Sequence, residues 1–149
     1  MIKEIRFFDQ RHGWAVGVSS AMYPAGIFRT RDGGRSWSTL PSGRTAGWQT
    51  ADFHDHRHGA VAGSGGQAGW VTGNELKPLA NPPWGSRTLR SLRLASPTEG
   101  WLVGDQGLVF VSHDGGNRWQ PPPASLPRSV ELQFDFQALA LRGKHCWIA

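Results

Sequence analysis

The sequence predicts an all-β fold, a partial β-propeller of four-stranded antiparallel blades. Three observations carry this prediction. The composition is rich in strand and turn residues, a segment repeats in steps of 46, 41 and 46 residues, and one turn motif recurs in register with that repeat. We expect a single partial propeller domain over 1–149, with about three blades and the start of a fourth.

The composition favours short strands over helices. The 149 residues include eight Trp, 20 Gly and 10 Pro, and only 18% are charged. Gly and Pro punctuate short strands, whereas Trp and Phe suit half-buried pleated surfaces. No window has apolar residues at helical spacing over three turns, so we expect almost no helix.

A heptapeptide reveals the repeat, which has to be sought first because it sets the whole fold. FFDQRHG at 7–13 returns as FHDHRHG at 53–59, and each copy runs into a small apolar segment, WAVG at 14–17 and AVAG at 60–63. A looser third copy is LASPTEGWLVG at 94–104, and a fourth begins at LALRGKHCWIA, 139–149.

Each unit is expected to hold four strands, because turn residues separate four short segments. In the first unit we expect strands at 3–8, 14–18, 26–31 and 36–40, and in the third at 91–95, 101–104, 108–112 and 118–121. Four short strands in ~40–45 residues match one propeller blade. The predicted blades are about 1–46, 47–87, 88–132 and 133–149, the last incomplete.

One turn motif keeps the same period. TRDGGRSW (30–37) and SHDGGNRW (112–119) both fit S/T-x-D-G-G-x-x-W, whereas TGNELKPL at 72–79 keeps only Thr72. We expect the Asp to accept N–H bonds, the Gly pair to allow positive φ, the hydroxyl to bond across the hairpin and the Trp to cover it. These structural residues are Thr30, Asp32, Gly33, Gly34 and Trp37 in the first copy, and Ser112, Asp114, Gly115, Gly116 and Trp119 in the third.

These motifs resemble a known family. TRDGGRSW and SHDGGNRW look like Asp-boxes, the signature of bacterial neuraminidase (BNR) repeats. The fuller unit, IRFFDQRHGWAVG followed by GIFRTRDGGRSW, resembles the repeat of the photosystem II stability/assembly factor family and its bacterial relatives. The resemblance is strong over 2–40 and 89–120, weak over 48–80, and limited to the start of a unit over 136–149. It implies a non-enzymatic protein-binding scaffold or assembly/stability factor without a cofactor, whose relatives are often exported or lumenal.

The number of blades does not close a ring. A propeller has about 4–8 blades, and six or seven would need about 250–300 residues at ~42 each. Three interpretations stay open: the chain is a fragment of a longer protein, it closes by pairing with another copy or another chain, or it persists as an open arc with covered edges.

The Asp-box also raises a second functional class, a sialidase-like or other carbohydrate-binding or glycoside hydrolase propeller. A sialidase needs an Arg triad and a Tyr/Glu pair, but Tyr23 is the only Tyr, and no Glu has an evident Tyr partner. Other retaining glycosidases need two facing carboxylates, whereas Asp and Glu here sit mostly in turns. We therefore expect no catalytic residues.

The net charge of +5 and the pI of about 10.3 permit an acidic partner. WGSRTLRSLRL at 84–94 carries Arg87, Arg90 and Arg93 on the expected first strand of the third blade. The first strand of a blade is usually innermost, so these three are candidate contacts for an acidic protein partner. Exposed Arg side chains on a connection fit the pattern equally well.

A second basic cluster surrounds the first Asp-box. Arg29, Arg31 and Arg35 are expected at the outer edge of the blade. Trp recurs with the repeat period, which is typical of a core rather than of a base-stacking platform, so we expect no nucleic-acid partner.

The stretch FHDHRHG also fits a metal site, because alternation would place His54, His56 and His58 on one face of a strand. The repeat instead places it at a turn, where His58 matches His12. Two remaining imidazoles make a poor zinc site, so we expect no metal.

The single Cys and the apolar runs bear on the cellular compartment of the protein. Cys146 is the only Cys, so no internal disulfide can form, and we expect it to be a buried small apolar residue. The start MIKEIRFFDQ has no apolar core typical of a signal peptide, and no apolar run approaches a membrane span. The compartment stays open.

Overall fold

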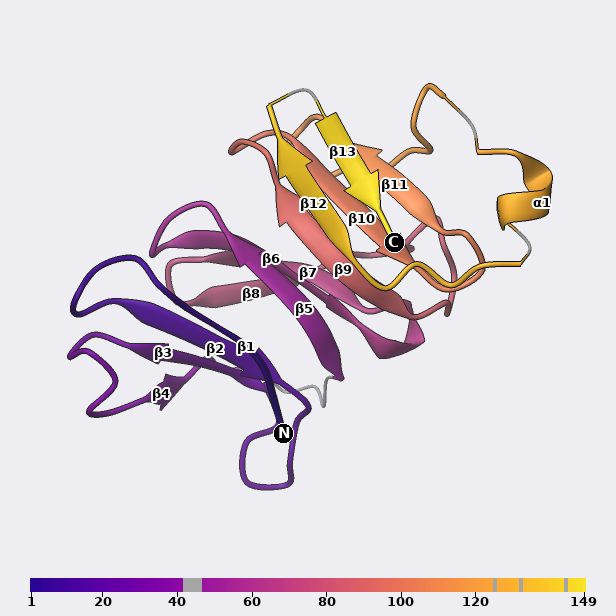
Figure 1. Cartoon of the computed structure of the whole chain (residues 1–149). Helices are drawn as coiled ribbons and strands as arrows, with labels where there is room; N and C mark the ends of the chain where they lie inside the picture. Colours follow the sequence, from indigo (N-terminus) through magenta and orange to yellow (C-terminus); the bar gives the residue numbers. More distant parts are fainter. Residues whose placement is uncertain (42–46, 125, 132, 144) are drawn as a thin grey trace.

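Four antiparallel sheets follow one another along an arc in the computed structural model, which describes residues 1–41, 47–124, 126–131, 133–143 and 145–149 (Figure 1). The all-β prediction is confirmed. The first sheet contains β1 (Ile2–Phe7), β2 (Gly13–Gly17), β3 (Ile27–Thr30) and β4 (Ser38–Thr39). The second contains β5 (Trp48–Phe53), β6 (His58–Gly63), β7 (Ala68–Thr72) and β8 (Glu75–Pro78), with a 3-10 turn, η1 (Ser64–Gly66), between β6 and β7.

The second half of the chain is less complete. The third sheet contains β9 (Leu89–Leu94), β10 (Gly100–Gly104) and β11 (Val109–Ser112). One helical turn, α1 (Arg128–Glu131), precedes a hairpin of β12 (Leu139–Arg142) and β13 (His145–Ile148). These elements lie within the four predicted blade ranges, whose boundaries remain a prediction. Residues 42–46 and 132, at two of those boundaries, lie outside the described residues.

The strand expected at 118–121 is reduced to a single bridge. Gln120 and Val111 exchange both backbone hydrogen bonds, at 2.8 and 3.0 Å, and no further pairing follows. The reason is that 121–123 are three consecutive Pro residues, which have no N–H to donate to a ladder.

The first strands of successive blades lie side by side. β1 contacts β5, β5 contacts β9 and β9 contacts β12, whereas the later strands of each sheet fan outward (Figure 1). This arrangement matches the predicted blade order, in which the first strand forms the inner edge of each blade.

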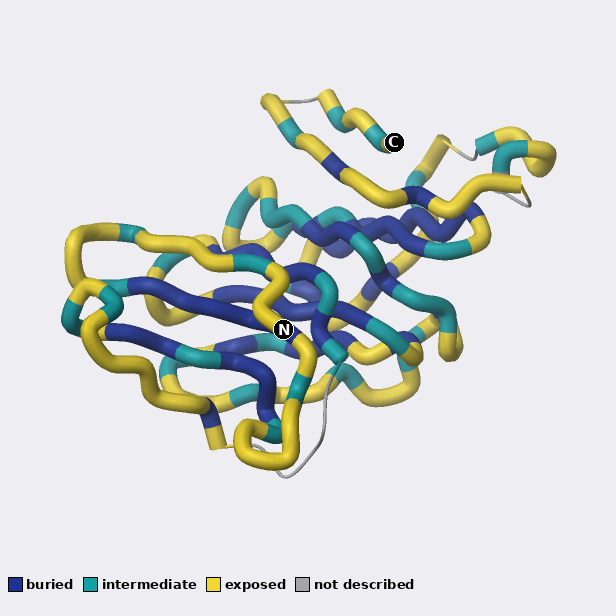
Figure 2. Tube along the Cα trace, turned by 60° about the horizontal axis from the view of Figure 1, so that its bottom comes forward, coloured by how far each residue is buried: buried dark blue, intermediate teal, exposed yellow. Residues whose placement is uncertain are grey.

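The core lies between neighbouring sheets, in three clusters of buried apolar side chains (Figure 2). Trp14 is almost fully buried between the first and second sheets, where its ring stacks on Phe53 with centroids 4.9 Å apart. Trp84 and Trp119 meet edge to face, 5.8 Å apart, between the second and third sheets. Burial of such large rings contributes to the packing between blades.

Pairing in the second blade is shifted by one residue against the sequence alignment. Gly13 pairs with Thr30 and Gly100 pairs with Ser112, but Gly59 pairs with Val71. The assumed equivalence of Thr72 to Thr30 is therefore wrong. The β7–β8 hairpin turns through only two residues, Gly73 and Asn74, so it needs no Asp-box.

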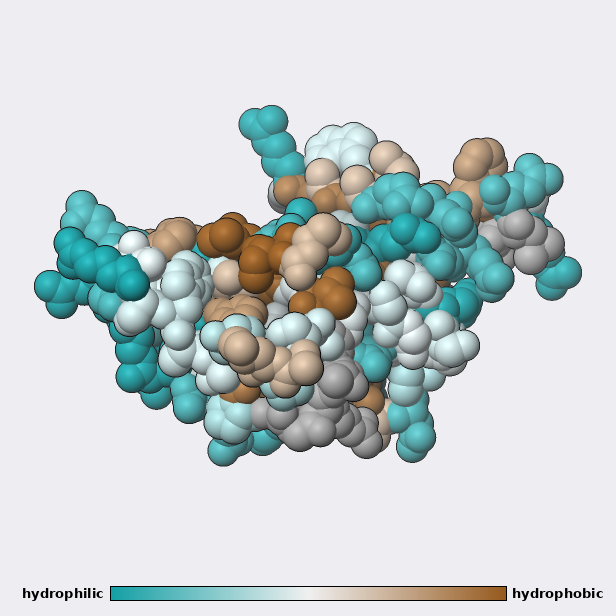
Figure 3. Space-filling model, turned by 90° about the horizontal axis from the view of Figure 1, so that it is seen from below, coloured by the Kyte–Doolittle hydropathy of each residue, from teal (hydrophilic) through white to brown (hydrophobic). Residues whose placement is uncertain are grey.

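The outer face of β1 is exposed. Ile5 and Phe7 are 57% and 47% exposed, whereas Ala51 and Phe53, at the matching positions of β5, are each 3% exposed because the first sheet covers them. Figure 3 shows apolar surface gathered on one face of the molecule. Within the described ranges, no helix has the length and apolar character needed to cross a membrane.

Candidate functional site

Both Asp-boxes form the turns expected for them. In the first, the Thr30 hydroxyl donates to Asp32 Oδ1 at 2.8 Å and accepts the N–H of Gly34 at 2.8 Å. Asp32 Oδ1 also accepts the N–H of Ser36 at 2.9 Å. The φ angles of Gly33 and Gly34 are 75° and 88°, in the left-handed region that favours glycine. The hydroxyl of Thr30 and the carboxylate of Asp32 therefore find their hydrogen-bond partners within the motif.

The third blade repeats this geometry with other residues. The Ser112 hydroxyl donates to Asp114 Oδ1 at 3.0 Å and accepts the N–H of Gly116 at 2.7 Å, and Asp114 Oδ1 accepts the N–H of Arg118 at 2.9 Å. Trp119 is buried, as expected, but Trp37 is 38% exposed and meets Phe7 edge to face. Trp37 is therefore a weaker cover for its turn than the sequence suggested.

In each of three blades, the turn between the first and second strands bonds to the turn after the third strand. In the β1–β2, β5–β6 and β9–β10 turns, the side chain of the second residue after the strand accepts bonds from two following N–H groups. A carbonyl of the same turn accepts a bond from a glycine N–H of the neighbouring turn. The capping residues are Asp9, Asp55 and Ser96, and the glycine-to-carbonyl pairs are Gly33–Arg11, Gly73–Arg57 and Gly115–Thr98. The recurrence identifies the turn carboxylates as structural.

Hydrogen bonding stabilises these carboxylates in their charged form. Bonds from the Ser36 side chain and N–H, together with the Thr30 hydroxyl, lower the pKa of Asp32 from 3.8 to about 2. Partial burial raises the pKa of Asp55, but bonds from His58 and the N–H of Arg57 outweigh it and bring the pKa to about 2. The N–H of Arg118 is the main cause of the lowered pKa of Asp114.

The histidine stretch is part of this turn system. His58 Nδ1 lies 2.9 Å from Asp55 Oδ2, as His12 Nδ1 lies 2.8 Å from Asp9 Oδ2. The His56 ring lies 5.0 Å from the His12 ring of the first blade. Among the described residues, no three His, Cys, Asp or Glu side chains gather closely enough to hold a metal ion.

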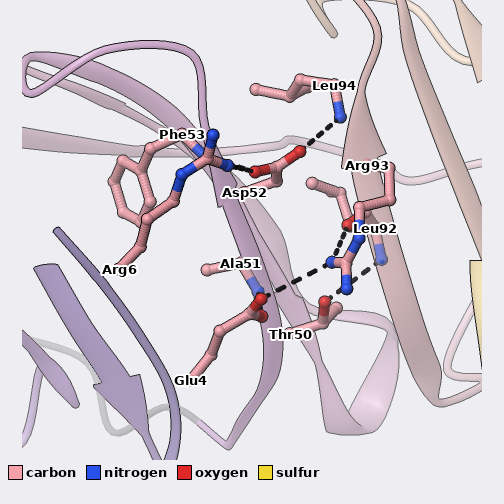
Figure 4. A network of polar contacts seen from close by, with 9 residues as sticks. All are labelled: Glu4, Arg6, Thr50, Ala51, Asp52, Phe53, Leu92, Arg93 and Leu94. Atoms are coloured by element: carbon pink, nitrogen blue, oxygen red, sulfur yellow. Dashed lines mark hydrogen bonds and ion pairs between the residues drawn. The ribbon is translucent and has the colours of Figure 1, made fainter. Parts of the chain in front are cut away.

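A polar network joins the first strands of three blades (Figure 4). The Ala51 N–H donates to Glu4 at 2.9 Å, and the Leu92 N–H donates to the Thr50 hydroxyl at 3.1 Å. Glu4 and Thr50 hold the same repeat position, so each of the first two blades supplies a side-chain acceptor to the backbone of the next. Asp52 adds an ion pair with Arg6 and accepts the N–H of Leu94 at 2.8 Å.

The three candidate partner residues have separate contacts inside the chain. Arg87 precedes β9 and donates to the Trp84 carbonyl at 3.1 Å. Arg90 pairs with Asp105 and reaches Gln137 at 3.2 Å. Arg93 donates to the Leu92 carbonyl at 2.7 Å and lies 3.6 Å from Glu4 (Figure 4). The side chains are half-buried, and each is held by a different partner.

The second basic cluster contains two exposed Arg residues and one buried Arg. Arg31 and Arg35 are exposed, but Arg29 is only 8% exposed and lies between the first and second blades. Its Nη1 donates to the Gly73 carbonyl at 2.9 Å and its Nη2 to Asn74 Oδ1 at 2.8 Å. Arg29 is buried because the β7–β8 turn of the second blade offers acceptors to its two terminal nitrogens. The position of the cluster at the outer edge of the blade stays a prediction.

Cys146 is half-buried rather than fully buried. It packs against the third apolar cluster, and desolvation there raises the pKa of its thiol. A raised thiol pKa disfavours the reactive thiolate.

One family model matches the second half of the chain. Residues 85–149 match the family model described as photosynthesis system II assembly factor YCF48. A segment of 48 residues is 40% identical to the photosystem II stability/assembly factor HCF136 of the chloroplast of Cyanidioschyzon merolae. That segment covers 32% of this chain and 11% of the relative.

Solved structures are similar over more of the chain. YCF48 from Cyanidioschyzon merolae matches 99% of this chain and 47% of its own with a TM-score of 0.70 and 13% identity. YCF48 bound to a D1 peptide matches 80% of this chain and 38% of its own, with a TM-score of 0.65 and 22% identity. An ancestral GH74 enzyme matches 83% of this chain and 18% of its own, with a TM-score of 0.59 and 13% identity.

These findings confirm the predicted resemblance to BNR propellers of the photosystem II assembly factor type. The chain spans less than half the length of each of these relatives. At such low identity the structural matches describe the fold alone.

Proposed function

We propose that this chain is a protein-binding propeller segment that acts as an assembly or stability factor, and that it contributes to binding a peptide of its partner. The observation that carries the proposal is the family match over residues 85–149, because it covers the third blade and the hairpin after it. A solved relative that carries a D1 peptide supports a peptide as the kind of ligand.

The inner strand of the third blade is our candidate contact surface. Arg90 and Arg93 lie on β9, which is flanked by β5 on one side and β12 on the other. Their side chains are partly exposed, and the net charge of +5 favours a partner segment with acidic residues. Arg87 lies just before β9 and extends the same basic segment.

A non-enzymatic role is part of the proposal. Three of the carboxylates have structural partners: Asp32 and Asp114 close the Asp-boxes, and Asp52 holds the junction between blades. The similarity to a GH74 enzyme extends to the fold only, so no observation favours the carbohydrate alternative.

Peptide binding can be tested by fluorescence anisotropy with the labelled D1 peptide of the solved relative. We expect saturable binding that weakens at least tenfold in a variant with Arg87→Glu, Arg90→Glu and Arg93→Glu. A matched control reverses three exposed Arg residues elsewhere, Arg35→Glu, Arg128→Glu and Arg142→Glu, and should bind within about twofold of the unchanged chain because it has the same net charge.

Two results would contradict the proposal. One is equal weakening in both triple variants, which would indicate non-specific attraction. The other is turnover of a sialoside or a plant glucan by the unchanged chain, which would identify a hydrolase. Circular dichroism of each variant separates lost binding from lost fold.

A further inference from the structure

A basic hollow lies where the turns of the first and second blades meet. It has a volume of about 320 Å³ and is lined by His12, Arg29, Arg31, His56, Arg57, Gly73 and Asn74. The basic groups come from three separate segments, namely the β1–β2 turn, the end of β3 with the residue after it, and the β5–β6 turn. The described lining contains no carboxylate.

Arg29 is an exception to the repeat. It pairs with Trp14 across the sheet, and the residues at the matching positions of the next two blades are Trp70, paired with Ala60, and Val111, paired with Trp101. Two blades therefore place an apolar side chain where the first blade buries a guanidinium. Sites that break a local rule of a repeat in this way are candidates for function.

The surroundings of Arg29 leave its charge without a counter-ion. Its two terminal nitrogens donate to neutral oxygens of the β7–β8 turn, and its guanidinium carbon lies 5.3 Å from the Trp14 ring centroid. Its Nε–H is buried and has no hydrogen-bond partner among the described residues. Burial, followed by repulsion from Arg31 and Arg57, lowers the pKa of Arg29. A buried cation among other cations is costly unless an anion joins it.

Three carboxylates in these turns have other partners. Asp9 bonds the imidazole of His12 and the N–H groups of its own turn, and Asp32 bonds Thr30 and Ser36 within the Asp-box. Asp55 serves His58. The turns thus hold three acidic side chains close to the hollow in structural roles, and the charge of the Arg cluster is left for a ligand.

We propose that this hollow binds a phosphate group, with Arg29 at its base and Arg31 and Arg57 as the exposed arms. Three guanidinium groups suit a phosphate better than a single carboxylate, because a phosphate presents more acceptor oxygens and up to two negative charges. His56 adds a ring N–H donor at the rim. The chemistry is shared by inorganic phosphate and by a phosphate monoester.

Calorimetric titration of the whole chain with inorganic phosphate, at constant ionic strength and pH 7, tests the site. We expect saturable binding, with no comparable heat from acetate or chloride. Phosphoserine as titrant distinguishes a monoester ligand from free phosphate, since the tighter of the two identifies the source. Equal responses to all four anions would overturn the proposal, because they would indicate screening of surface charge alone.

Two exposed side chains provide variants that keep the fold. Arg31→Gln and Arg57→Gln each remove one arm, while the backbone bonds of residue 57 to Asp55 and Gly73 remain. Each should weaken phosphate binding at least tenfold. Arg35→Gln, in the same Asp-box but lining a neighbouring hollow, is the matched control and should leave binding within twofold. Unchanged affinity in both arm variants would refute the site.

Arg29→Met separates binding from stability. An apolar side chain is the type that the repeat places at this position in the next two blades, so the variant should fold, with a melting temperature equal to or above that of the unchanged chain, yet lose phosphate binding. A variant that still binds phosphate with full affinity would show that Arg29 only clamps the two blades together. The Arg Nε–H resonance in a ¹⁵N spectrum gives an independent readout, because phosphate should shift it in the unchanged chain.

Discussion

Asp52 of the second blade accepts a hydrogen bond from the backbone N–H of Leu94 in the third, at 2.8 Å, while its other oxygen pairs with Arg6 of the first. One 7% exposed carboxylate therefore joins three blades (Figure 4). Buried donors that lose an acceptor of this kind keep the full desolvation penalty.

Asp52→Ala should lower the free energy of unfolding by about 1 to 3 kcal/mol, mainly because it leaves the Leu94 N–H without its acceptor; the lost ion pair with the half-exposed Arg6 adds little. Thr50→Val removes one acceptor, that of Leu92, and should cost about 1 to 2 kcal/mol. Urea unfolding provides the measurement, with the exposed Glu75→Ala as a control within about 0.5 kcal/mol of the unchanged chain. A cost for Asp52→Ala no larger than that control would show that water replaces the carboxylate.

Phe7 and Phe53 are matching residues of the repeat in opposite environments. Phe53 is 3% exposed and stacks on Trp14, whereas Phe7 is 47% exposed. Phe53→Ala should cost about 3 to 5 kcal/mol through lost burial and a cavity, and Phe7→Ala about 1 kcal/mol. Thermal and urea unfolding of the two variants check the difference, and equal costs would mean that the outer face of β1 is covered in solution.

Gly116→Ala should be among the most damaging small substitutions. Residue 116 has φ of 80°, and a Cβ there would overlap the indole of Trp70. We expect a loss of about 3 kcal/mol or more from backbone strain and displaced packing. Gly65→Ala is the matched control, because its φ is 66° but a Cβ there meets open space; strain alone should cost about 1 kcal/mol. Equal losses in an unfolding titration would exclude a role for the Trp70 contact.

Acid should destabilise the fold through the turn carboxylates. The pKa values of Asp9, Asp32 and Asp55 are about 2 in the folded chain against an ordinary 3.8. A depressed pKa means that each contribution is complete above pH 3.8 and is lost as the pH falls towards 2. The free energy of unfolding should therefore decrease over that window.

Two amide variants test the origin of that acid dependence. Asp32→Asn and Asp55→Asn keep an acceptor oxygen but cannot bind the proton, so each should flatten the decrease between pH 4 and pH 2. The residues lie in different blades, so the double variant should flatten it about twice as much. If the free energy of unfolding falls between pH 4 and pH 2 as steeply in both single variants as in the unchanged chain, the acid sensitivity belongs to other groups.

The sequence predicted the repeat, the order of strands and the Asp-box turns, because these depend on contacts within about ten residues. The turns at Asp32 and Asp114 follow from local hydrogen bonds, and FHDHRHG served as a reliable measure of the period. The strand predicted at 118–121 is only a single bridge, because the three Pro residues at 121–123 have no N–H to donate to a ladder.

The environment of Arg29 could not be read from sequence in the same way. Its acceptors lie 44 and 45 residues away, in the two-residue β7–β8 turn. The length of that turn depends on the strand register, in which Gly59 pairs with Val71 rather than with Thr72. The neighbouring Arg31 is exposed, so a run of basic residues did not distinguish buried from solvated positions. Trp84 shows the same limit, since the linker NPPW delivers a ring that is 2% exposed.

The bonds that Ala51 donates to Glu4 and Leu92 donates to Thr50 share one direction: the donor is the main chain of the later blade, and the acceptor is a side chain of the earlier one. Every strand carries N–H groups whatever its side chains, so these two bonds need no particular residue in the later blade. A duplicated or exchanged unit can thus be accommodated wherever its predecessor carries the acceptor. Such one-sided coupling between neighbours lets an array lengthen and diverge one unit at a time.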